Sequence, residues 1–203
     1  MNELTPSLDL SPPAPRRQRH TRRIHAEGFE REDGLWDIEA RIVDTKTYPY
    51  NEPYRGRREP GSRVHDMVVR LTLDPSLVVR GIEVVFPSTP YGDCAHSGPT
   101  FDRLIGARVT SGWRKAVMDA VGGAKGCTHV RELLFPMATV AIQTIVGWPE
   151  ATEGEGGARM PGPRDPNTRP PFIDGCYAWS SSGNVVKDLY PTFYVTPADD
   201  ASE

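Results

Sequence analysis

The sequence predicts an α+β domain in which an antiparallel sheet of about four strands is followed by three helices packed on one face. Two observations lead to this prediction. Apolar and polar residues first alternate with the strand period of two, and after about residue 98 the apolar residues recur with the helical period of 3.6. The strand-like segments all precede the helix-like ones, which is the element order of an α+β fold.

The strands are identified by alternation and by the turns between them. Trp36, Ile38, Ala40 and Ile42 share one face, and charged residues occupy the positions between them. His65 shares a face with the apolar residues of the next strand in the same way. The predicted strands cover residues 22–29, 36–46, 64–74 and 78–86. Residues 49–62 contain several Gly and Pro and are predicted to be a loop.

Three helices are predicted from the period of 3.6. The first surrounds Phe101, and the second follows Ser111, its predicted N-cap, and ends at a Gly-Gly pair. The third follows Thr128, its predicted N-cap, and runs to about Val146. Pro136 is expected to kink this third helix, because proline lacks the N–H that the helix needs.

We interpret the 203 residues as one domain with tails and a loop. The predicted parts are a disordered Pro-rich tail (1–18), an α+β core (19–148), a Gly/Pro-rich loop (149–171), a returning aromatic segment of the same domain (172–196) and an acidic tail (197–203). The returning segment is expected to add an edge strand or to cover a pocket.

The composition argues against several classes of protein. A net charge of −3 disfavours a nucleic-acid-binding protein held by bulk electrostatics. We find no secretory signal and no apolar run of the ~18 residues that a membrane span needs. Three cysteines are too few for a disulfide scaffold. We therefore expect a soluble cytoplasmic protein with no nucleic-acid or membrane partner, and we leave open whether it forms a homo-oligomer.

A first polar cluster is predicted on the apolar face of the sheet. Strand alternation places Asp44, Lys46 and His65 on the same face as buried apolar residues. Charged groups are seldom buried without a partner. Two interpretations remain open: Asp44 and Lys46 form an ion pair at a frayed strand end, or the cluster lies at the mouth of a pocket, where partial burial tunes a base.

A second cluster consists of Cys94, Cys127 and His129. Cys127 and His129 flank a predicted helix N-terminus, where the helix dipole lowers a thiol pKa and favours a neutral imidazole. This arrangement suits metal ligation, thiolate chemistry or a histidine base. The alternative is that Cys127 simply packs under a Gly-rich turn. The Cys-x-His spacing is not a standard zinc-finger spacing, and with Cys94 it supplies only three ligands.

A run of arginines and a set of aromatic residues are two further candidate ligand-binding sites. The basic run of residues 16–25 is interpreted either as solvated surface or as a binding site for an anionic ligand. Tyr48, Tyr50 and Tyr54 lie in one loop, and further aromatic residues crowd the C-terminal segment. They either cover the core or line the pocket of a flat aromatic ligand. We find no phosphate-binding Gly loop, nucleophile elbow or dinucleotide fingerprint.

The blocks HTRRIHAEGFEREDGLWDIEARIVDTK, HDMVVRLTLD and GCTHVRELL resemble an uncharacterised bacterial family, a domain of unknown function, over about residues 19–196. Some members of that family are associated with breakdown of lignin-derived aromatic dimers, so the resemblance implies a γ-formaldehyde lyase. The strand-then-helix order is also similar to the iron–sulfur scaffold and sulfur-acceptor fold. This chain departs from that family's three-cysteine pattern, because Cys176 lies in a late aromatic segment.

The resemblance implies a cofactor-independent lyase that releases formaldehyde from a lignin-derived phenolic diaryl compound and leaves a stilbene. We expect a small aromatic substrate, no cofactor and no metal. The expected catalytic residues are His65, Asp44, Lys46 and His129, and the expected substrate-binding residues are Arg22, Arg70, Trp36 and Tyr48. The chemistry requires a base, a cation or acid for the leaving oxygen, and an apolar slot. The alternative is a non-enzymatic ligand, sulfur or metal carrier that uses Cys94, Cys127 and His129.

Overall fold

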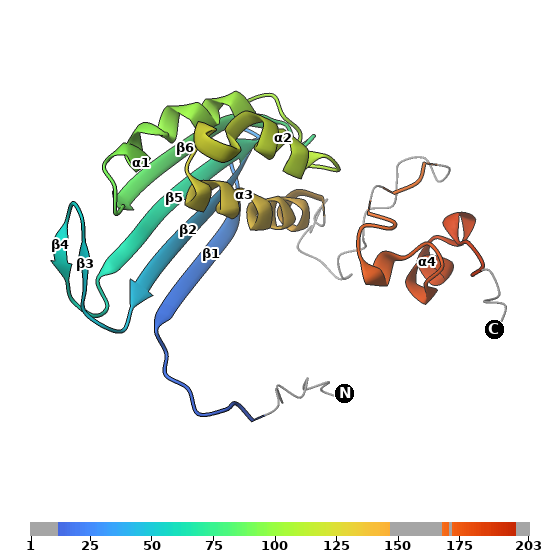
Figure 1. Cartoon of the computed structure of the whole chain (residues 1–203). Coiled ribbons are helices and arrows are strands. Elements are labelled where there is room, and N and C mark those ends of the chain that lie inside the picture. The colour runs from blue at the N-terminus through green and yellow to red at the C-terminus, as the bar shows by residue number, and fades with distance from the viewer. Residues whose placement is uncertain (1–11, 147–167, 171, 198–203) are drawn as a thin grey trace.

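A four-stranded antiparallel sheet forms the centre of the protein (Figure 1). The computed structural model describes residues 12–146, 168–170 and 172–197. The strands are β1 (His20–Glu30), β2 (Trp36–Lys46), β5 (Arg63–Leu73) and β6 (Val79–Ser88), and their order in the sheet is β1-β2-β5-β6. Sequential strands are therefore neighbours. The predicted strands are confirmed, with bounds that differ by at most two residues.

The connection between β2 and β5 is more regular than predicted. It contains a two-stranded hairpin of β3 (Tyr50–Glu52) and β4 (Gly56–Arg58), where the sequence predicts a loop over residues 49–62. Strands of three residues are too short to show an alternation, so the sequence pattern gives no signal for them. The hairpin forms its own small sheet beside the main one.

Helices follow the strands, as predicted, and pack on one face of the sheet (Figure 1). They are α1 (Asp93–His96), the 3₁₀ helix η1 (Gly98–Leu104), α2 (Trp113–Val121), the 3₁₀ turn η2 (Gly123–Lys125), α3 (Thr128–Ala141) and the π-helical turn η3 (Ile142–Val146). The helix predicted around Phe101 is the 3₁₀ helix η1. Pro136 lies inside α3.

Both predicted helix caps are wrong by one residue. The N-cap of α2 is Gly112 instead of Ser111, and its φ of +95° is one that glycine adopts without a steric penalty. The N-cap of α3 is Cys127 instead of Thr128. Neither cap residue forms a side-chain hydrogen bond, so the usual sequence signal for a helix start is missing from both.

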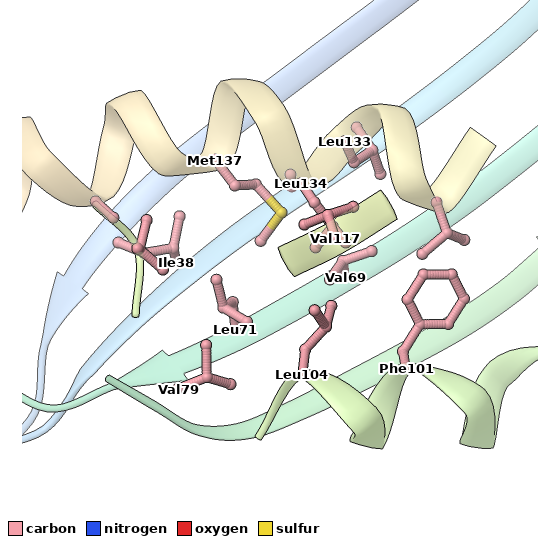
Figure 2. Packing of buried hydrophobic residues seen from close by; sticks show 14 of the residues in the cluster. Ile38, Val69, Leu71, Val79, Phe101, Leu104, Val117, Leu133, Leu134 and Met137 are labelled. Atoms are coloured by element: carbon pink, nitrogen blue, oxygen red, sulfur yellow. The ribbon is translucent and has the colours of Figure 1, made fainter. Parts of the chain in front are cut away.

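The core lies between the sheet and the helices (Figure 2). Its sheet side consists of inward residues of β2, β5 and β6, and its helix side includes residues from η1, α2 and α3. The larger side chains of this core include Ile38, Val69, Leu71, Val79, Phe101, Leu104, Val117, Leu133, Leu134 and Met137. The indole N–H of Trp113 donates a 2.8 Å hydrogen bond to the carbonyl of Leu134, which joins α2 to α3.

Ion pairs cover the opposite face of the sheet. The fully buried carboxylate of Asp66 accepts hydrogen bonds from Arg41 at 2.7 and 2.8 Å and from Arg63 at 2.7 Å. On the same face, Arg70 lies between Glu39 and Glu83. The helices therefore cover one face of the sheet, while arginine and carboxylate side chains cover much of the other.

The described part of the C-terminal segment consists of short helices joined by turns and irregular backbone. It contains η4 (Tyr177–Trp179), α4 (Asn184–Leu189) and η5 (Pro191–Phe193), so the predicted edge strand is wrong. Its aromatic residues Phe172, Trp179 and Tyr190 pack against one another. The predicted tail over residues 1–18 and loop over 149–171 lie largely outside the described residues. No described helix has the length and apolar character required to cross a membrane.

A close contact between β1 and the end of the helical layer provides a test of this packing. A Cβ atom at Gly28 would lie 2.7 Å from Cγ2 and 2.8 Å from Cβ of Thr144, closer than real Cβ contacts allow. We predict that Gly28→Ala lowers the free energy of unfolding by about 1–3 kcal/mol, the usual cost of overpacking. Chemical denaturation followed by circular dichroism measures the change.

Gly81→Ala is the matched control. Gly81 also lies in a strand, and its nearest contact would be 3.7 Å, an ordinary van der Waals distance. If Gly28→Ala were no less stable than Gly81→Ala, β1 would not pack against η3 as described.

Candidate functional site

Three neighbouring strands bring Arg22, Asp44 and His65 side by side. Asp44 is paired with Arg22 of β1 on one side and with His65 of β5 on the other. Residues that are directly opposite in adjacent strands point to the same face and touch. The pairing of β2 with β5 shifts after Asp44, so the regular register ends at this point. The cluster therefore lies at the end of the sheet, on the face that the helices cover.

The Asp44 carboxylate is the centre of this cluster. It is 1% exposed, and its two oxygens accept hydrogen bonds from Nε and Nη2 of Arg22, each at 2.8 Å. Nδ1 of His65 lies 2.9 Å from Oδ2, and Nε2 of His20 lies 3.3 Å from Oδ1. This bidentate geometry is the strong form of an arginine–carboxylate pair. The buried charge of Asp44 is thus balanced by a guanidinium.

His129 joins the cluster from the helical layer. It is the second residue of α3, which packs on β1, β2 and β5. Its ring stacks on that of His65, with centroids 3.6 Å apart and 28° between the planes. Its Nε2 lies 4.0 Å from Oδ2 of Asp44. Two imidazoles and one carboxylate from three elements therefore meet at one point.

The surroundings keep both stacked imidazoles neutral near pH 7. Burial lowers the pKa of His65, and the Asp44 carboxylate offsets that effect only in part. Burial, together with the neighbouring His65 and Arg22, lowers the pKa of His129 to about 4. Burial alone would raise the pKa of Asp44, but the hydrogen bond and charge of Arg22, with His65, hold it below its ordinary value. The site thus combines an ionised carboxylate with two unprotonated rings.

A pocket of about 480 Å³ opens beside the stacked histidines. This volume lies in the range of about 300–1,000 Å³ that is typical of small-molecule sites. The lining residues are His65, Pro90, Tyr91, Asp93, Cys94, Ser97, Ala124, Gly126, Cys127, Thr128 and His129. This lining contains neither lysine nor arginine. His65 of the predicted sheet cluster therefore lines the same pocket as Cys94, Cys127 and His129 of the cluster predicted at the helix N-terminus.

The other predicted site residues lie elsewhere. Lys46 lies over the ring of Tyr50, with Nζ 4.1 Å from its centroid, and Tyr48 lies under the guanidinium of Arg19. Neither Lys46 nor Tyr48 lines the pocket. The predicted ion pair between Asp44 and Lys46 is wrong, because Asp44 pairs with Arg22 instead.

Trp36 and Arg70 are further from the cluster. Trp36 is at the start of β2, the strand end opposite to Asp44, where it packs against the core. Arg70 lies on the face of the sheet that the helices do not cover, paired with Glu39. Of the predicted substrate-binding residues, Arg22 alone contacts the cluster, and its contact is with Asp44.

Sequence reasoning missed His20 and Tyr91. His20 precedes Arg22 by two residues on β1, so alternation would have placed it on the same face. Tyr91 belongs to the segment between β6 and α1, where no periodic pattern predicts the direction of a side chain. The C-terminal aromatic residues are absent from the lining of this pocket.

Asp44, His65 and His129 also form a group that has the composition of a metal site. One ligand atom from each lies within 4.8 Å of the others, and Cys94 and Cys127 are not in such a group among the described residues. However, both Asp44 oxygens already accept hydrogen bonds from Arg22. A cation would have to displace the guanidinium or bind beside its positive charge. The donor set therefore suits proton transfer better than metal ligation.

Comparisons with known proteins place most of this architecture in one family. A family model described as "Protein of unknown function (DUF2889)" matches residues 20–143, which extend from β1 to η3 and include the whole cluster. No curated protein and no solved structure matches the chain. The similarity to the iron–sulfur scaffold fold therefore stays a prediction.

The pKa of His129 has a consequence for stability. With a pKa of about 4 in the folded protein, His129 binds a proton less readily than it does in the unfolded chain, where about 6.5 is ordinary. The unfolded state thus holds more protons between these values. We predict that the free energy of unfolding falls as the pH drops from about 6.5 towards 4, with no penalty above this window and the full penalty below it.

NMR titration of the histidine ring protons measures this directly, and His129→Gln assigns the signal. Denaturation at pH 7 and pH 4.5 then compares wild type with His129→Gln, in which this part of the pH dependence is expected to disappear. His96→Gln is the control, because the side chain of His96 is exposed. A His129 ring that titrates near pH 6.5 would contradict the described burial.

Proposed function

This chain belongs to the DUF2889 family of proteins of unknown function, and we propose that it is a cofactor-independent carbon–carbon lyase. Its proposed substrate is a phenolic diaryl compound with a primary alcohol, from which it releases formaldehyde and leaves a stilbene. The observation that supports this proposal is the hydrogen bond between His65 and the buried Asp44, beside a second neutral imidazole on the wall of a pocket. Positioned neutral imidazoles are the usual general bases of proteins near pH 7.

The proposed step is a fragmentation driven by loss of one proton. A base removes the proton of the γ-hydroxyl, and the electron pair of that O–H bond forms the carbonyl of formaldehyde. The C–C bond to the adjacent carbon breaks, and its electrons form the new double bond while the benzylic hydroxyl of the substrate leaves. When the removed proton is returned to that oxygen, the products are formaldehyde, a stilbene and water. Neither an oxidant nor a reductant is consumed.

The two imidazoles divide these tasks. His65 is the proposed base, because Asp44 orients its ring through Nδ1 and stabilises the imidazolium that forms. His129 stacks on His65, and the N–H of its neutral ring is the proposed hydrogen-bond donor to the leaving oxygen, which receives the proton that His65 removed. Arg22 is a positioning residue, because it holds both oxygens of Asp44.

The character of the pocket supports an uncharged substrate. Its lining contains no lysine or arginine, so a phosphate or carboxylate would find no cation there. Pro90, Tyr91 and Ala124 offer apolar contacts instead. The lignin-derived origin of the substrate rests on the sequence resemblance, and action in the cytoplasm is part of the same proposal.

The second candidate function is a non-enzymatic sulfur or metal carrier. The observation that favours it is that Cys94, Cys127 and His129 line the same pocket. Against it, the ligand atoms of Cys94, Cys127 and His129 do not form a group close enough to hold one metal ion among the described residues. Metal and acid-labile sulfide analysis of the purified protein tests this candidate.

The lyase is tested by incubating the purified protein with phenolic diaryl compounds and measuring formaldehyde. We predict that His65→Ala lowers kcat at least ~100-fold, the lower range for loss of one general base. His129→Ala is expected to lower kcat as well. A thiol has no role in this fragmentation, so Cys127→Ser is expected to keep most of the activity, and it serves as the control from the same pocket.

Other outcomes separate the two candidates. Activity that survives in His65→Ala but is lost in Cys127→Ser would overturn the site assignment in favour of thiol or metal chemistry. Bound metal or sulfide in a protein that releases no formaldehyde would favour the carrier.

A further inference from the structure

We propose that Tyr54 and Tyr91 form an aryl-binding subsite at the mouth of the pocket, where they hold the ring of the substrate that lies away from the histidines. This inference rests on the proposed function, because it assumes a substrate with two aromatic rings. The subsite would determine which substrates bind, whereas the cleavage of the bond itself does not require it.

The geometry of the two rings supports this subsite. Tyr91 lines the pocket and is 49% exposed, and Tyr54 is 78% exposed. Their centroids are 5.9 Å apart with 75° between the planes, the edge-to-face arrangement that aromatic pairs favour. Much of both rings therefore remains in contact with solvent beside an open pocket. A third ring can stack on either of them without displacing a protein group.

The β3–β4 hairpin holds Tyr54 in this position. Tyr54 lies between the two strands, and its neighbour Arg55 forms an ion pair with the buried Glu52. Arg55 also donates hydrogen bonds to Oγ of Ser88 at 2.7 Å and to the carbonyl of Val64 at 3.1 Å. The hairpin is thus tied to the end of the main sheet from which the chain continues to Tyr91.

Ser88 strengthens the same connection. It is the last residue of β6, and its hydroxyl donates a 2.9 Å hydrogen bond to the carbonyl of Arg63 at the start of β5. Arg55 therefore contacts the end of one strand and the beginning of its neighbour. Because Tyr91 follows Ser88 by three residues, the two tyrosines approach the pocket from anchored segments. Such anchoring reduces the entropy lost when a ligand is bound.

The chemistry of the lining favours an aryl ring as the occupant. The proposed reaction breaks the bond to the hydroxymethyl carbon and forms a double bond between the two carbons that join the rings. These reacting carbons must therefore lie at His65 with one ring on each side. Without lysine or arginine in the lining, a ring is recognised by stacking and by apolar contact. The two tyrosines provide both, and their hydroxyls can hydrogen-bond a phenol.

Binding of trans-4-hydroxystilbene, a fluorescent two-ring phenol of the product class, tests the subsite. We predict that Tyr54→Ala and Tyr91→Ala each raise its Kd roughly two- to tenfold, the range expected for the loss of one aromatic contact. Tyr91→Phe is expected to bind nearly as well as wild type. Tyr177→Ala is the control, because Tyr177 is 99% exposed and does not line the pocket. For the one-ring probe 4-methylphenol, we predict a smaller change in each alanine variant.

The outcomes distinguish the subsite from the lyase. If wild type does not bind the stilbene, or if Tyr54→Ala and Tyr91→Ala bind it as Tyr177→Ala does, the subsite is overturned. The same holds if both alanine variants weaken the one-ring and two-ring probes equally. If the predicted pattern of binding appears but wild type releases no formaldehyde, the lyase proposal fails and the aryl subsite stands.

Discussion

The site depends on one interaction, the bidentate pair between Arg22 and the buried carboxylate of Asp44. An ionised carboxylate that is 1% exposed is costly unless a charged, hydrogen-bonded partner compensates it. Arg22 provides that partner from the adjacent strand. Asp44 can therefore stay ionised below the helices and orient His65, while His129 stacks above. Without the guanidinium, the carboxylate would gain a proton or remain unpaired, and neither state would orient the imidazole in the same way.

Sequence patterns predict the sheet and half of the site for a common reason. Alternation depends only on local geometry, so it identifies the four strands and places Asp44 and His65 on the covered face. The same rule also puts Lys46 on that face, but its long side chain turns to Tyr50 at the strand end. The β3–β4 hairpin is too short to show a period. The helix starts at Gly112 and Cys127 lack capping side chains, so the predicted caps are one residue off.

The sequence could not predict that His129 meets His65, because this contact depends on how α3 crosses the sheet. His65 and His129 are far apart in the sequence, and no local pattern indicates that their rings stack. Trp36 and Arg70 lie away from the cluster for a related reason. Alternation assigns Trp36 to the covered face but says nothing of which strand end holds the pocket, and Arg70 belongs to the opposite face. Position along a strand matters as much as the face.

Because the charge of Asp44 is cancelled by its neighbour, the site exerts little electric field at a distance. Charged pockets attract oppositely charged ligands and raise association rates by one to three orders of magnitude, an effect that salt suppresses. The imidazoles of this pocket are neutral and its lining has no basic residue, so it lacks this attraction for anions. The one carboxylate of the lining, Asp93, is fully exposed and therefore screened by solvent and salt. Ligands of the pocket therefore arrive by unguided diffusion and are selected by fit after contact, so the association rate should be almost independent of ionic strength.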